Sequence, residues 1–367
     1  MNQRTASPAW LIALLFGCGQ PETATDRPTS AGWTALPNAY AQHFEVQLRG
    51  ADRRLVVFGH GGRSDTVGVY RLMGEAQWGE LAVDTPLSRV AVVSTTHLAY
   101  LAALDARGIV VGIAHMDQVG DKGYKEQFHA GRIQEIARAD GIDRERLVAL
   151  DPQVLLDYPF GKGDRQANAF QATVGVTEYL EEHPLGRAEW IRFFGILVGK
   201  QHKADSLFEA IEHRYTFLRG LRTHLSTPPQ VGFASHWKQT WSMPPGNSYI
   251  STLIEDAGGT YVLADTVANG NIEFTLEEFL ALAAPLDHFG MLLATPGKVD
   301  VTTMAGGDPR VAALDPFRRG GFYGNSTTSD LFGQAMLEPD VILQDLRCIF
   351  HPALCRDHRP HYYYPVH

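Results

Sequence analysis

The sequence predicts an α/β protein of two lobes that are joined by a long helix. Strand-like and helix-like segments alternate from about residue 89 to residue 180, and the alternation restarts after "STPP" at 226–229. Between these blocks lies the longest helical stretch of the chain. Alternating strands and helices form a parallel sheet covered by helices, so each block predicts one lobe and the midpoint stretch predicts their connection.

The length and composition permit two domains and argue against nucleic acid as a partner. The chain has 367 residues, of which 44% are hydrophobic and 20% are charged, and its formal net charge is -9. This length suffices for two domains of ordinary size. An acidic balance without a Lys/Arg run argues against a nucleic-acid surface. After the N-terminus, no apolar run reaches the ~18 residues that a membrane span needs.

The first 38 residues predict export and a tether. Residues 1–18 combine one Arg with a short apolar run from Trp10 to Phe16, as an export signal does. The stretch "LFGC" resembles a bacterial lipobox, in which Cys18 becomes the lipidated first residue; an ordinary signal with a chance Cys is the alternative. Residues 19–38 are rich in Pro, Thr, Ala and Gly, which predicts a disordered tether. We therefore expect a lipid-anchored protein on the periplasmic or cell-surface face of a membrane.

Residues 39–185 form the predicted N-terminal lobe. The alternation in "FEVQLRGADRRLVVFG" around a Gly-Ala-Asp turn predicts a leading β-hairpin, and "VGVYRLM" predicts a further edge strand. The run "RVAVVST" is typical of a buried parallel strand, and "THLAYLAALDA" follows it as a helix. The segments "IVVGIAH", "VLLDY" and "QATVGVTEY" supply more strands.

Residues 186–226 form the predicted connecting helices. Apolar side chains recur there at helical spacing, in two groups: Trp190, Phe193, Phe194 and Leu197, then Leu207, Phe208, Ile211, Tyr215 and Leu218. The second helix extends over roughly five turns and would be about 30 Å long at ~1.5 Å per residue. That length suffices to cross from one lobe to the other.

Residues 227–357 form the predicted C-terminal lobe, and residues 358–367 a tail. The segments "QVGFASHW" and "HFGMLLAT" are typical of strands. The segment "SYISTLIEDAGG" predicts a helix that ends at a Gly pair, and "TLEEFLALAAP" predicts a helix with Thr275 as its N-cap. The segment "PDVILQDLRCIF" closes the lobe as a helix.

Cysteines are few. Export favours an oxidising compartment, so we expect a short-loop disulfide between Cys348 and Cys355. Two free thiols are the alternative. No CxxC pair or Cys/His array indicates zinc.

Five stretches follow one another in the order "PLSRVAVVSTTHLAYLAAL", "RERLVALDPQVLLD", "EYLEEHPLGRAEWIRFFG", "SMPPGNSYISTLIEDAGG" and "LEPDVILQDLRCIFHPAL". In this order they resemble the substrate-binding proteins of bacterial ABC importers for iron complexes, haem and cobalamin. The resemblance spans about residues 37–354. The resemblance implies the class III periplasmic binding fold, in which two Rossmann-like lobes are joined by one rigid helix. A stiff connection would limit closure of the cleft between the lobes.

The expected ligand site lies beyond the carboxyl ends of the strands, where open α/β sheets bind ligands. Hydroxyls, helix amides and an imidazole follow the first strands, and aromatic side chains follow a strand of the second lobe. N-capping and turn packing are alternatives for the first group, and core packing for the second. The candidates are Ser94, Thr95, Thr96, His97, Met116, Tyr158, Phe160, Trp237, Trp241, Met243, Tyr323 and Asn325.

The resemblance also implies permease docking through one glutamate on each lobe. Matching the motifs assigns this role to Glu145 in "RERLVAL" and Glu277 in "TLEEFL", with Glu278 as a competitor for the second position. Both candidates lie near helix N-termini, where a carboxylate is favourable in any case. The implied partners are an ABC permease and its ATPase, and the chain itself is expected to be a monomer.

The ligand class stays open between an iron complex such as a siderophore, haem and a cobamide. The sequence lacks a His-rich loop that would indicate a bare metal ion as the ligand. We expect no resident cofactor, although the transported ligand would carry iron or cobalt. A metal-ion receptor of the same fold is an alternative. An esterase-like hydrolase is disfavoured, because "VVFGHGGRSDT" has an HGG segment but no G-x-S-x-G elbow follows it.

Overall fold

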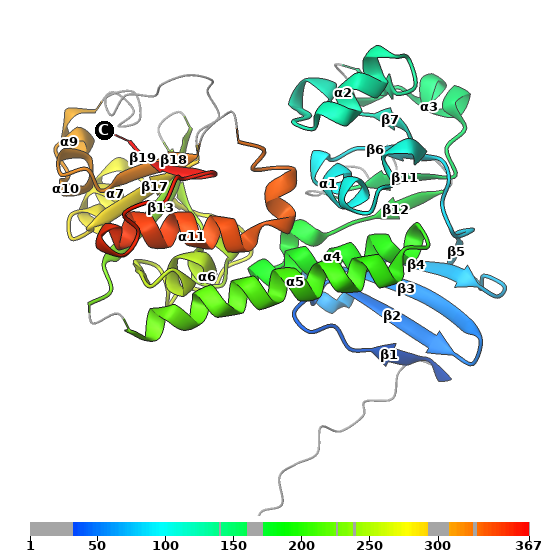
Figure 1. The fold of residues 1–367 in the computed structure, drawn as a ribbon, viewed down its shortest axis with the longest axis horizontal. Helices are drawn as coiled ribbons and strands as arrows, with labels where there is room; N and C mark the ends of the chain where they lie inside the picture. Colours follow the sequence, from blue (N-terminus) through cyan, green and yellow to red (C-terminus); the bar gives the residue numbers. More distant parts are fainter. Residues whose placement is uncertain are drawn as a thin grey trace, which may run out of the picture.

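The computed structural model describes residues 32–138, 141–159, 172–224, 227–237, 240–292, 308–325 and 329–366 (Figure 1). The predicted signal peptide, residues 19–31 of the predicted tether, Cys18 and Phe160 lie outside these ranges. Two α/β lobes lie side by side, and two helices run along the same side of both. The predicted fold class is thus the one observed.

A sheet of five strands precedes the first lobe. Its order is β1 (Thr34–Leu36), β2 (Phe44–Arg49), β3 (Asp52–Gly59), β4 (Gly62–Met73) and β5 (Leu81–Ala82). The β2–β3 turn places Gly50 at φ +60°, a conformation that favours glycine. The predicted hairpin is therefore part of a larger sheet, since β1 and β4 pair with its two outer edges and β5 pairs with β4.

Trp33, near the start of the described chain, packs against arginine side chains of this sheet. Its ring is 2% exposed, and the guanidinium carbons of Arg49, Arg54 and Arg71 lie 4.6, 4.2 and 4.4 Å from its centroid. Arg54 and Arg71 also form ion pairs with Glu80, at 2.7 and 2.6 Å. Stacked guanidiniums that are also ion-paired hold an aromatic side chain firmly.

The first lobe has a parallel sheet in the order β12-β11-β6-β7-β8. Val90 and Val92 face the main core, while Ala91 and Val93 face a smaller cluster on the other side, as the alternation of a strand requires. The strands are β6 (Val90–Val92), β7 (Val110–Ile113), β8 (Gln134–Glu135), β11 (Val154–Asp157) and β12 (Thr173–Gly175), with the hairpin β9 (Ala137–Arg138) and β10 (Gly141–Ile142).

Capped helices connect these strands. The side chains of Ser94, Asp121 and Asp143 accept hydrogen bonds from the first turns of three helices, which stabilises each helix start. These helices are α1 (Thr95–Ala103), α2 (Lys122–His129) and α3 (Arg144–Leu150), and the short helices are η2 (Arg107–Ile109), η3 (Met116–Gln118) and η4 (Glu178–Leu180).

The connection consists of α4 (Pro184–Leu197) and α5 (Gln201–Gly220), followed by η5 (Leu221–His224). We call α4 and α5 the strut. The predicted apolar spacing is borne out, since Trp190, Phe193, Phe208, Ile211 and Tyr215 are buried in the main core. With 20 residues, α5 is about 30 Å long at 1.5 Å per residue.

Two buried glutamates, Glu189 on the strut and Glu181 just before it, hold the N-terminal segment. Glu189 accepts hydrogen bonds of 2.8, 2.7 and 2.8 Å from the amides of Ala39, Tyr40 and Ala41. Glu181 accepts from the next two amides, at residues 42 and 43, each at 2.9 Å. Carboxylates held by several amides are strong local anchors, so the sheet and the strut form one unit.

The second lobe has the strand order β16-β14-β13-β17-β18-β19, with β15 also paired to β13. The strands are β13 (Gln230–Trp237), β14 (Thr240–Met243), β15 (Thr260–Tyr261), β16 (Ile272–Phe274), β17 (His288–Met291), β18 (Phe322–Asn325) and β19 (Tyr363–Pro365). The helices are α6 (Tyr249–Asp256), α7 (Leu276–Ala283), α9 (Pro309–Ala312), α10 (Asp315–Arg318), η6 (Gln334–Leu337), α11 (Pro339–Phe350) and η7 (Pro352–Leu354).

The predicted tail forms part of this lobe. A disulfide joins Cys348 to Cys355 at the end of α11, and β19 then pairs antiparallel with β18. Within the described ranges, no helix is both long enough and apolar enough to span a membrane.

Candidate functional site

A cavity of about 350 Å³, which we call the cleft cavity, is lined by residues of both lobes and of the strut. Thr96 and Glu178 follow the carboxyl ends of β6 and β12, while Phe233 and Ser235 lie on β13 of the other lobe. Arg187 of α4 also lines it. The cavity thus occupies the position at which open α/β sheets bind ligands.

Lobe one contributes a chain of hydroxyl and carboxylate contacts. The Oγ atoms of Ser94 and Thr96 lie 2.7 Å apart, and Thr96 Oγ1 donates to Glu178 Oε1 at 2.6 Å. Glu178 Oε2 lies 3.6 Å from His97 Nε2. Burial alone would raise the pKa of Glu178, but His97, Thr96 and Arg187 outweigh it and lower that pKa below its ordinary value. The carboxylate is 2% exposed, so its charge is compensated inside the lobe.

Arg187 brings a positive charge to the cleft cavity. Its Nε donates to the carbonyl of Glu181 and its Nη2 to the carbonyl of Tyr179, at 3.3 and 3.0 Å. Its guanidinium lies over the ring of Tyr249, 4.0 Å from the centroid. In the described part of the chain, Nη1 has no acceptor, so this nitrogen is free to donate to a ligand.

Lobe two contributes hydroxyls and a helix N-terminus. Ser248 is the N-cap of α6 and accepts from the amide of Ser251 at 3.2 Å. Ser242, Ser248, Tyr249 and Tyr363 all line the cavity. Burial raises the pKa of Tyr249 and of Tyr363 above that of a free phenol, so both hydroxyls stay protonated and can donate. Helix N-termini favour negative charge, so this wall suits an acceptor or an anion.

Apolar side chains form the rest of the lining. Phe332 is 56% exposed and Leu292 is 37% exposed; both line the cavity with Leu331 and Met336. Thr95 Oγ1 donates to the carbonyl of Phe332 at 3.0 Å. This hydrogen bond joins α1 to the segment before η6 and so links the two lobes at the cavity.

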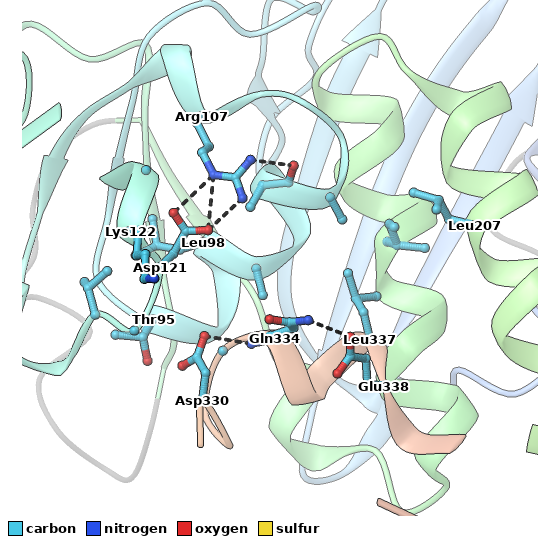
Figure 2. Close-up of a pocket in the computed structure, with 18 of the residues that line it drawn as sticks. Thr95, Leu98, Arg107, Asp121, Lys122, Leu207, Asp330, Gln334, Leu337 and Glu338 are labelled. Carbon is cyan, nitrogen blue, oxygen red and sulfur yellow. Dashed lines mark hydrogen bonds and ion pairs between the residues drawn. The ribbon is translucent and has the colours of Figure 1, made fainter. Parts of the chain in front are cut away.

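A second cavity of about 700 Å³ lies between lobe one, the strut and η6; we call it the side cavity (Figure 2). Within its lining, Arg107 pairs with Asp121 at 2.6 Å, and the amide of Gln334 donates to Glu338 at 2.6 Å. Its walls are helices and residues 119–123 rather than strand ends. The cleft cavity is therefore the better candidate for the ligand site.

The start of α1 is divided between the two cavities. Thr96 lines the cleft cavity and Thr95 lines the side cavity, while Ser94 is the N-cap of α1.

Two other candidates of lobe one are core residues. The prediction that His97 faces the ligand is wrong, because the ring is fully buried and packs 5.9 Å from the ring of Phe194. Met116 is 8% exposed in the main core and lines neither cavity.

The aromatic prediction for lobe two is also wrong for Trp241. The side chain is 1% exposed and stacks on Phe279 at 3.9 Å between centroids. Residues of β14 alternate between partly exposed and buried positions, so Trp241 and Met243 share the inner face. Trp241 is thus a core residue, and Met243 with 0% exposure is another.

Three further candidates lie beside the cleft cavity without lining it. Tyr323 is fully buried, and Asn325 is 6% exposed and pairs through its backbone with Tyr363. Tyr158 is 38% exposed and packs 6.4 Å from Tyr179, which does line the cavity. The backbone of Trp237 pairs with residue 240, but the side chain of Trp237 and the whole of Phe160 lie outside what the structure describes.

The sequence analysis did not include Arg187, Tyr363 or Tyr249 among the ligand candidates. These residues come from α4, β19 and α6, so no local spacing brings them together. The available signal was weak, because Arg187 lies in the first turn of a helix that also carries Glu189 and Arg192. Within the described ranges, no group of three His, Cys, Asp or Glu side chains could hold a metal ion.

The predicted docking glutamates are exposed and lie on different lobes. Glu145 is in the first turn of α3. The side chain of Glu277, in the first turn of α7, is 74% exposed and lies 3.5 Å from Arg310. Glu278 completes a capping box with Thr275, so its carboxylate is engaged and Glu277 is the better candidate of the two.

Comparison with known proteins agrees with this architecture. The sequence profile of the family described as periplasmic binding protein matches residues 90–285. An uncharacterized lipoprotein of Methanocaldococcus jannaschii is 25% identical over 296 residues, covering 77% of this chain and 69% of that protein.

Solved structures with TM-scores of 0.59 share the fold. One is CeuE of Helicobacter pylori with Ni(II) bound, at 15% identity, covering 78% of this chain and 91% of that one. Another is the molybdate-binding protein MolA of Haemophilus influenzae, at 15% identity with 75% and 90% covered. A third is a periplasmic haem-binding protein of Pseudomonas aeruginosa, at 13% identity with 73% and 94% covered. The matched structures are of binding proteins rather than enzymes.

Proposed function

Because the chain belongs to the family of periplasmic binding proteins, we propose that it is the receptor of an ABC importer and captures an anion-bearing iron chelate or haem in the cleft cavity. The observation that carries this proposal is the convergence of donors on one cavity. Arg187, the Tyr249 phenol and the N-termini of α1 and α6 all border it. Donors and helix N-termini together select a ligand with oxygen acceptors or negative charge.

The apolar lining supports a chelate rather than a small ion. Phe233, Phe332 and Leu292 also border the cavity, which suits a ligand with an anionic pole and an apolar or planar body. Carboxylate and catecholate siderophores and haem have this character. A cobamide offers fewer anionic groups, so we rank it behind the other two.

The volume indicates how such a ligand would be held. About 350 Å³ is near the lower end of the ~300–1,000 Å³ range of small-molecule sites. We expect the cavity to enclose the anionic pole of a chelate and the rims of the two lobes to hold the remainder. Because the strut is packed on both lobes, closure on binding would be small.

A bare metal cation is a weaker candidate. In the ranges that the structure describes, no cluster of His, Cys, Asp and Glu could hold one, and Glu178 is engaged by Thr96 and His97. A free oxyanion is a separate outcome of the test, since the donors would also suit it; MolA of Haemophilus influenzae was solved with molybdate.

We also propose that lipidated Cys18 holds the receptor at the outer face of the membrane, and that residues 19–38 act as its tether. The lipoprotein name of the Methanocaldococcus relative supports this assignment. Glu145 and Glu277 would then meet the permease, which works with an ATPase. We expect the receptor to act as a monomer.

The test is calorimetric titration with haemin, a ferric tris-catecholate complex and cyanocobalamin, with molybdate and free Fe(III) as controls. We expect one of the two anionic complexes to bind with one-to-one stoichiometry at micromolar concentration or below. Absence of binding by both anionic complexes would refute the chelate proposal, and binding of cyanocobalamin alone would redirect it to a cobamide receptor. Binding of molybdate alone would redirect it to an oxyanion receptor, and binding of free Fe(III) alone to a metal-ion receptor.

A further inference from the structure

The last described strand contributes a side chain to the wall of the cleft cavity. β19 pairs antiparallel with β18, and Tyr363 faces Asn325 in this register. Tyr363 lines the cleft cavity, although it is only 3% exposed. Its ring lies 6.2 Å from that of Phe233, which also lines the cavity, and 6.0 Å from that of the fully buried Tyr323. β19 therefore supplies the wall that Tyr323 was expected to supply.

The hydroxyl of Tyr363 has no partner within the described part of the protein. This hydroxyl is not among the fully enclosed polar atoms that lack a partner in the described ranges, whereas the hydroxyl of Tyr323 is, so the Tyr363 hydroxyl opens on the cavity that the residue lines. A phenol at such a site is ordinarily hydrogen-bonded. The neighbouring Tyr362 obeys this rule by donating to Glu338, and Tyr364 donates to the carbonyl of His361 at 2.8 Å. Tyr363 thus differs from the tyrosines on either side of it, and it is the one that faces the cavity.

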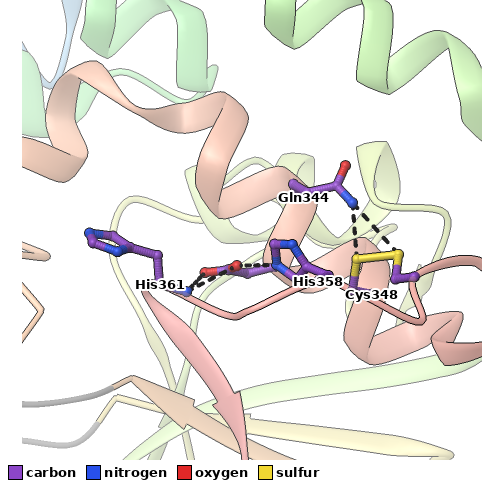
Figure 3. The surroundings of a disulfide bond; sticks show 6 residues. Gln344, Cys348, His358 and His361 are labelled. Atoms are coloured by element: carbon purple, nitrogen blue, oxygen red, sulfur yellow. Dashed lines mark hydrogen bonds and ion pairs between the residues drawn. A yellow bond between two sulfur atoms is a disulfide. The ribbon is translucent and has the colours of Figure 1, made fainter.

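One carboxylate holds this segment in place. Asp345 of α11 is fully buried and accepts hydrogen bonds from the amides of His361, Tyr362 and Tyr363, at 3.0, 2.6 and 3.2 Å. His358 Nε2 lies 2.7 Å from the same carboxylate. In Figure 3, dashed lines join the ring of His358 and the backbone nitrogen of His361 to this carboxylate, while the ring of His361 points away from it and the disulfide of Cys348 lies beside His358. A carboxylate with this many donors fixes backbone position closely.

We propose that Tyr363 is a ligand-contacting residue that sets specificity, and that Asp345 is the residue that positions it. The phenol donates a hydrogen bond to an oxygen of the ligand, next to the site of Arg187 and Tyr249. This inference rests on the proposed function. It adds that the segment after α11 takes part in ligand selection instead of only closing the lobe.

The test uses the full chain and two matched substitutions on one strand. Tyr363→Phe removes the hydroxyl that faces the cavity, and Tyr364→Phe removes a hydroxyl of the adjacent residue. The probe is whichever of haemin and the ferric tris-catecholate complex binds the wild type more tightly. We expect Tyr363→Phe to weaken binding about tenfold and Tyr364→Phe to change it by less than about twofold. Equal affinities for wild type and Tyr363→Phe would overturn the inference while leaving the proposed function intact.

The positioning role has its own readout. Asp345→Asn should weaken binding in the wild-type background but add little in the Tyr363→Phe background, because both changes act through one contact. Additive losses would overturn the positioning role of Asp345. If the wild type binds neither probe, the proposed function fails first and this inference fails with it.

Discussion

The guanidinium of Arg187 lies over the ring of Tyr249, with Cζ 4.0 Å from the centroid, and joins the strut to the second lobe at the cleft cavity. The two side chains come from the first turns of α4 and α6. A stacked guanidinium keeps its edge free for in-plane hydrogen bonds. The contact therefore holds the guanidinium at the cleft cavity in an orientation that can meet an anionic ligand.

The first prediction concerns this cation. Arg187→Lys keeps the positive charge but removes the planar fork and its stacking on Tyr249. We expect the dissociation constant for the bound chelate to rise about 30-fold, equivalent to about 2 kcal/mol, as measured by calorimetry. The melting temperature should fall as well, because the guanidinium hydrogen bonds to the carbonyls of Glu181 and Tyr179 and the stacking on Tyr249 are lost, so affinities are compared at a temperature at which both proteins are folded.

Arg214→Lys is the matched control for this prediction. Arg214 lines the side cavity and pairs with Asp340 at 2.6 Å. If the ligand occupies the cleft cavity, this substitution leaves affinity unchanged. Loss of affinity in Arg214→Lys, with retention in Arg187→Lys, would instead assign the ligand to the side cavity.

The fold could be predicted because local patterns determine its elements. The β-branched run "RVAVVST" contains β6, and the apolar spacing from Phe208 to Tyr215 lies on α5. The extra strands β1 and β5 were not predicted, because each has only two or three residues. The strand β19 was assigned to a tail, since its position depends on the buried Asp345 rather than on its own pattern.

The site was harder to predict than the fold. Thr96 was found because it follows a strand directly, and the resemblance places ligands at such ends. Arg187, Tyr249 and Tyr363 meet only through the packing of the strut on lobe two. The error at Trp241 was avoidable, because "TWSM" alternates in the period of a strand and puts Trp241 and Met243 on one face.

The second prediction tests this corrected role of Trp241. Because the ring is 1% exposed and stacked on Phe279, Trp241→Ala should lower the free energy of unfolding by about 3–5 kcal/mol. Urea denaturation followed by circular dichroism measures the change. Trp78 is fully exposed, so Trp78→Ala should stay within about 0.5 kcal/mol of wild type. A stable Trp241→Ala protein that has lost ligand binding would restore the original assignment of Trp241 to the ligand site.

The third prediction concerns acid stability. The pKa of Glu178 is lowered in the folded protein despite its burial, because His97, Thr96 and Arg187 stabilise the carboxylate. A group of this kind stabilises the fold fully above its unfolded pKa, near 4.5, and the stabilisation is lost as the pH falls through the lower folded value. We expect Glu178→Gln to lower the free energy of unfolding by about 3 kcal/mol at neutral pH. The difference from wild type should shrink below about pH 4.

Urea midpoints measured from about pH 7 to about pH 3 test this expectation. The control is Glu209→Gln, at an exposed position on α5, which should track the wild type throughout. A difference between Glu178→Gln and wild type that stays constant over the whole range would show that the charge of Glu178 is not what stabilises the fold.

The fourth prediction separates docking from ligand binding. Glu145 and Glu277 are exposed on different lobes and line neither cavity, so reversing both to Lys should leave the affinity for the chelate unchanged. Exposed ion pairs contribute at most about 1 kcal/mol each but orient encounters between charged surfaces. We therefore expect uptake of labelled chelate by cells to fall severalfold, and more steeply at low ionic strength.

Glu209→Lys on α5 is the control, because it changes the charge of an exposed helix elsewhere and should leave uptake intact. An equal fall in uptake for Glu209→Lys would attribute the effect to net charge, and a loss of chelate affinity in the double variant would assign these glutamates to the ligand site.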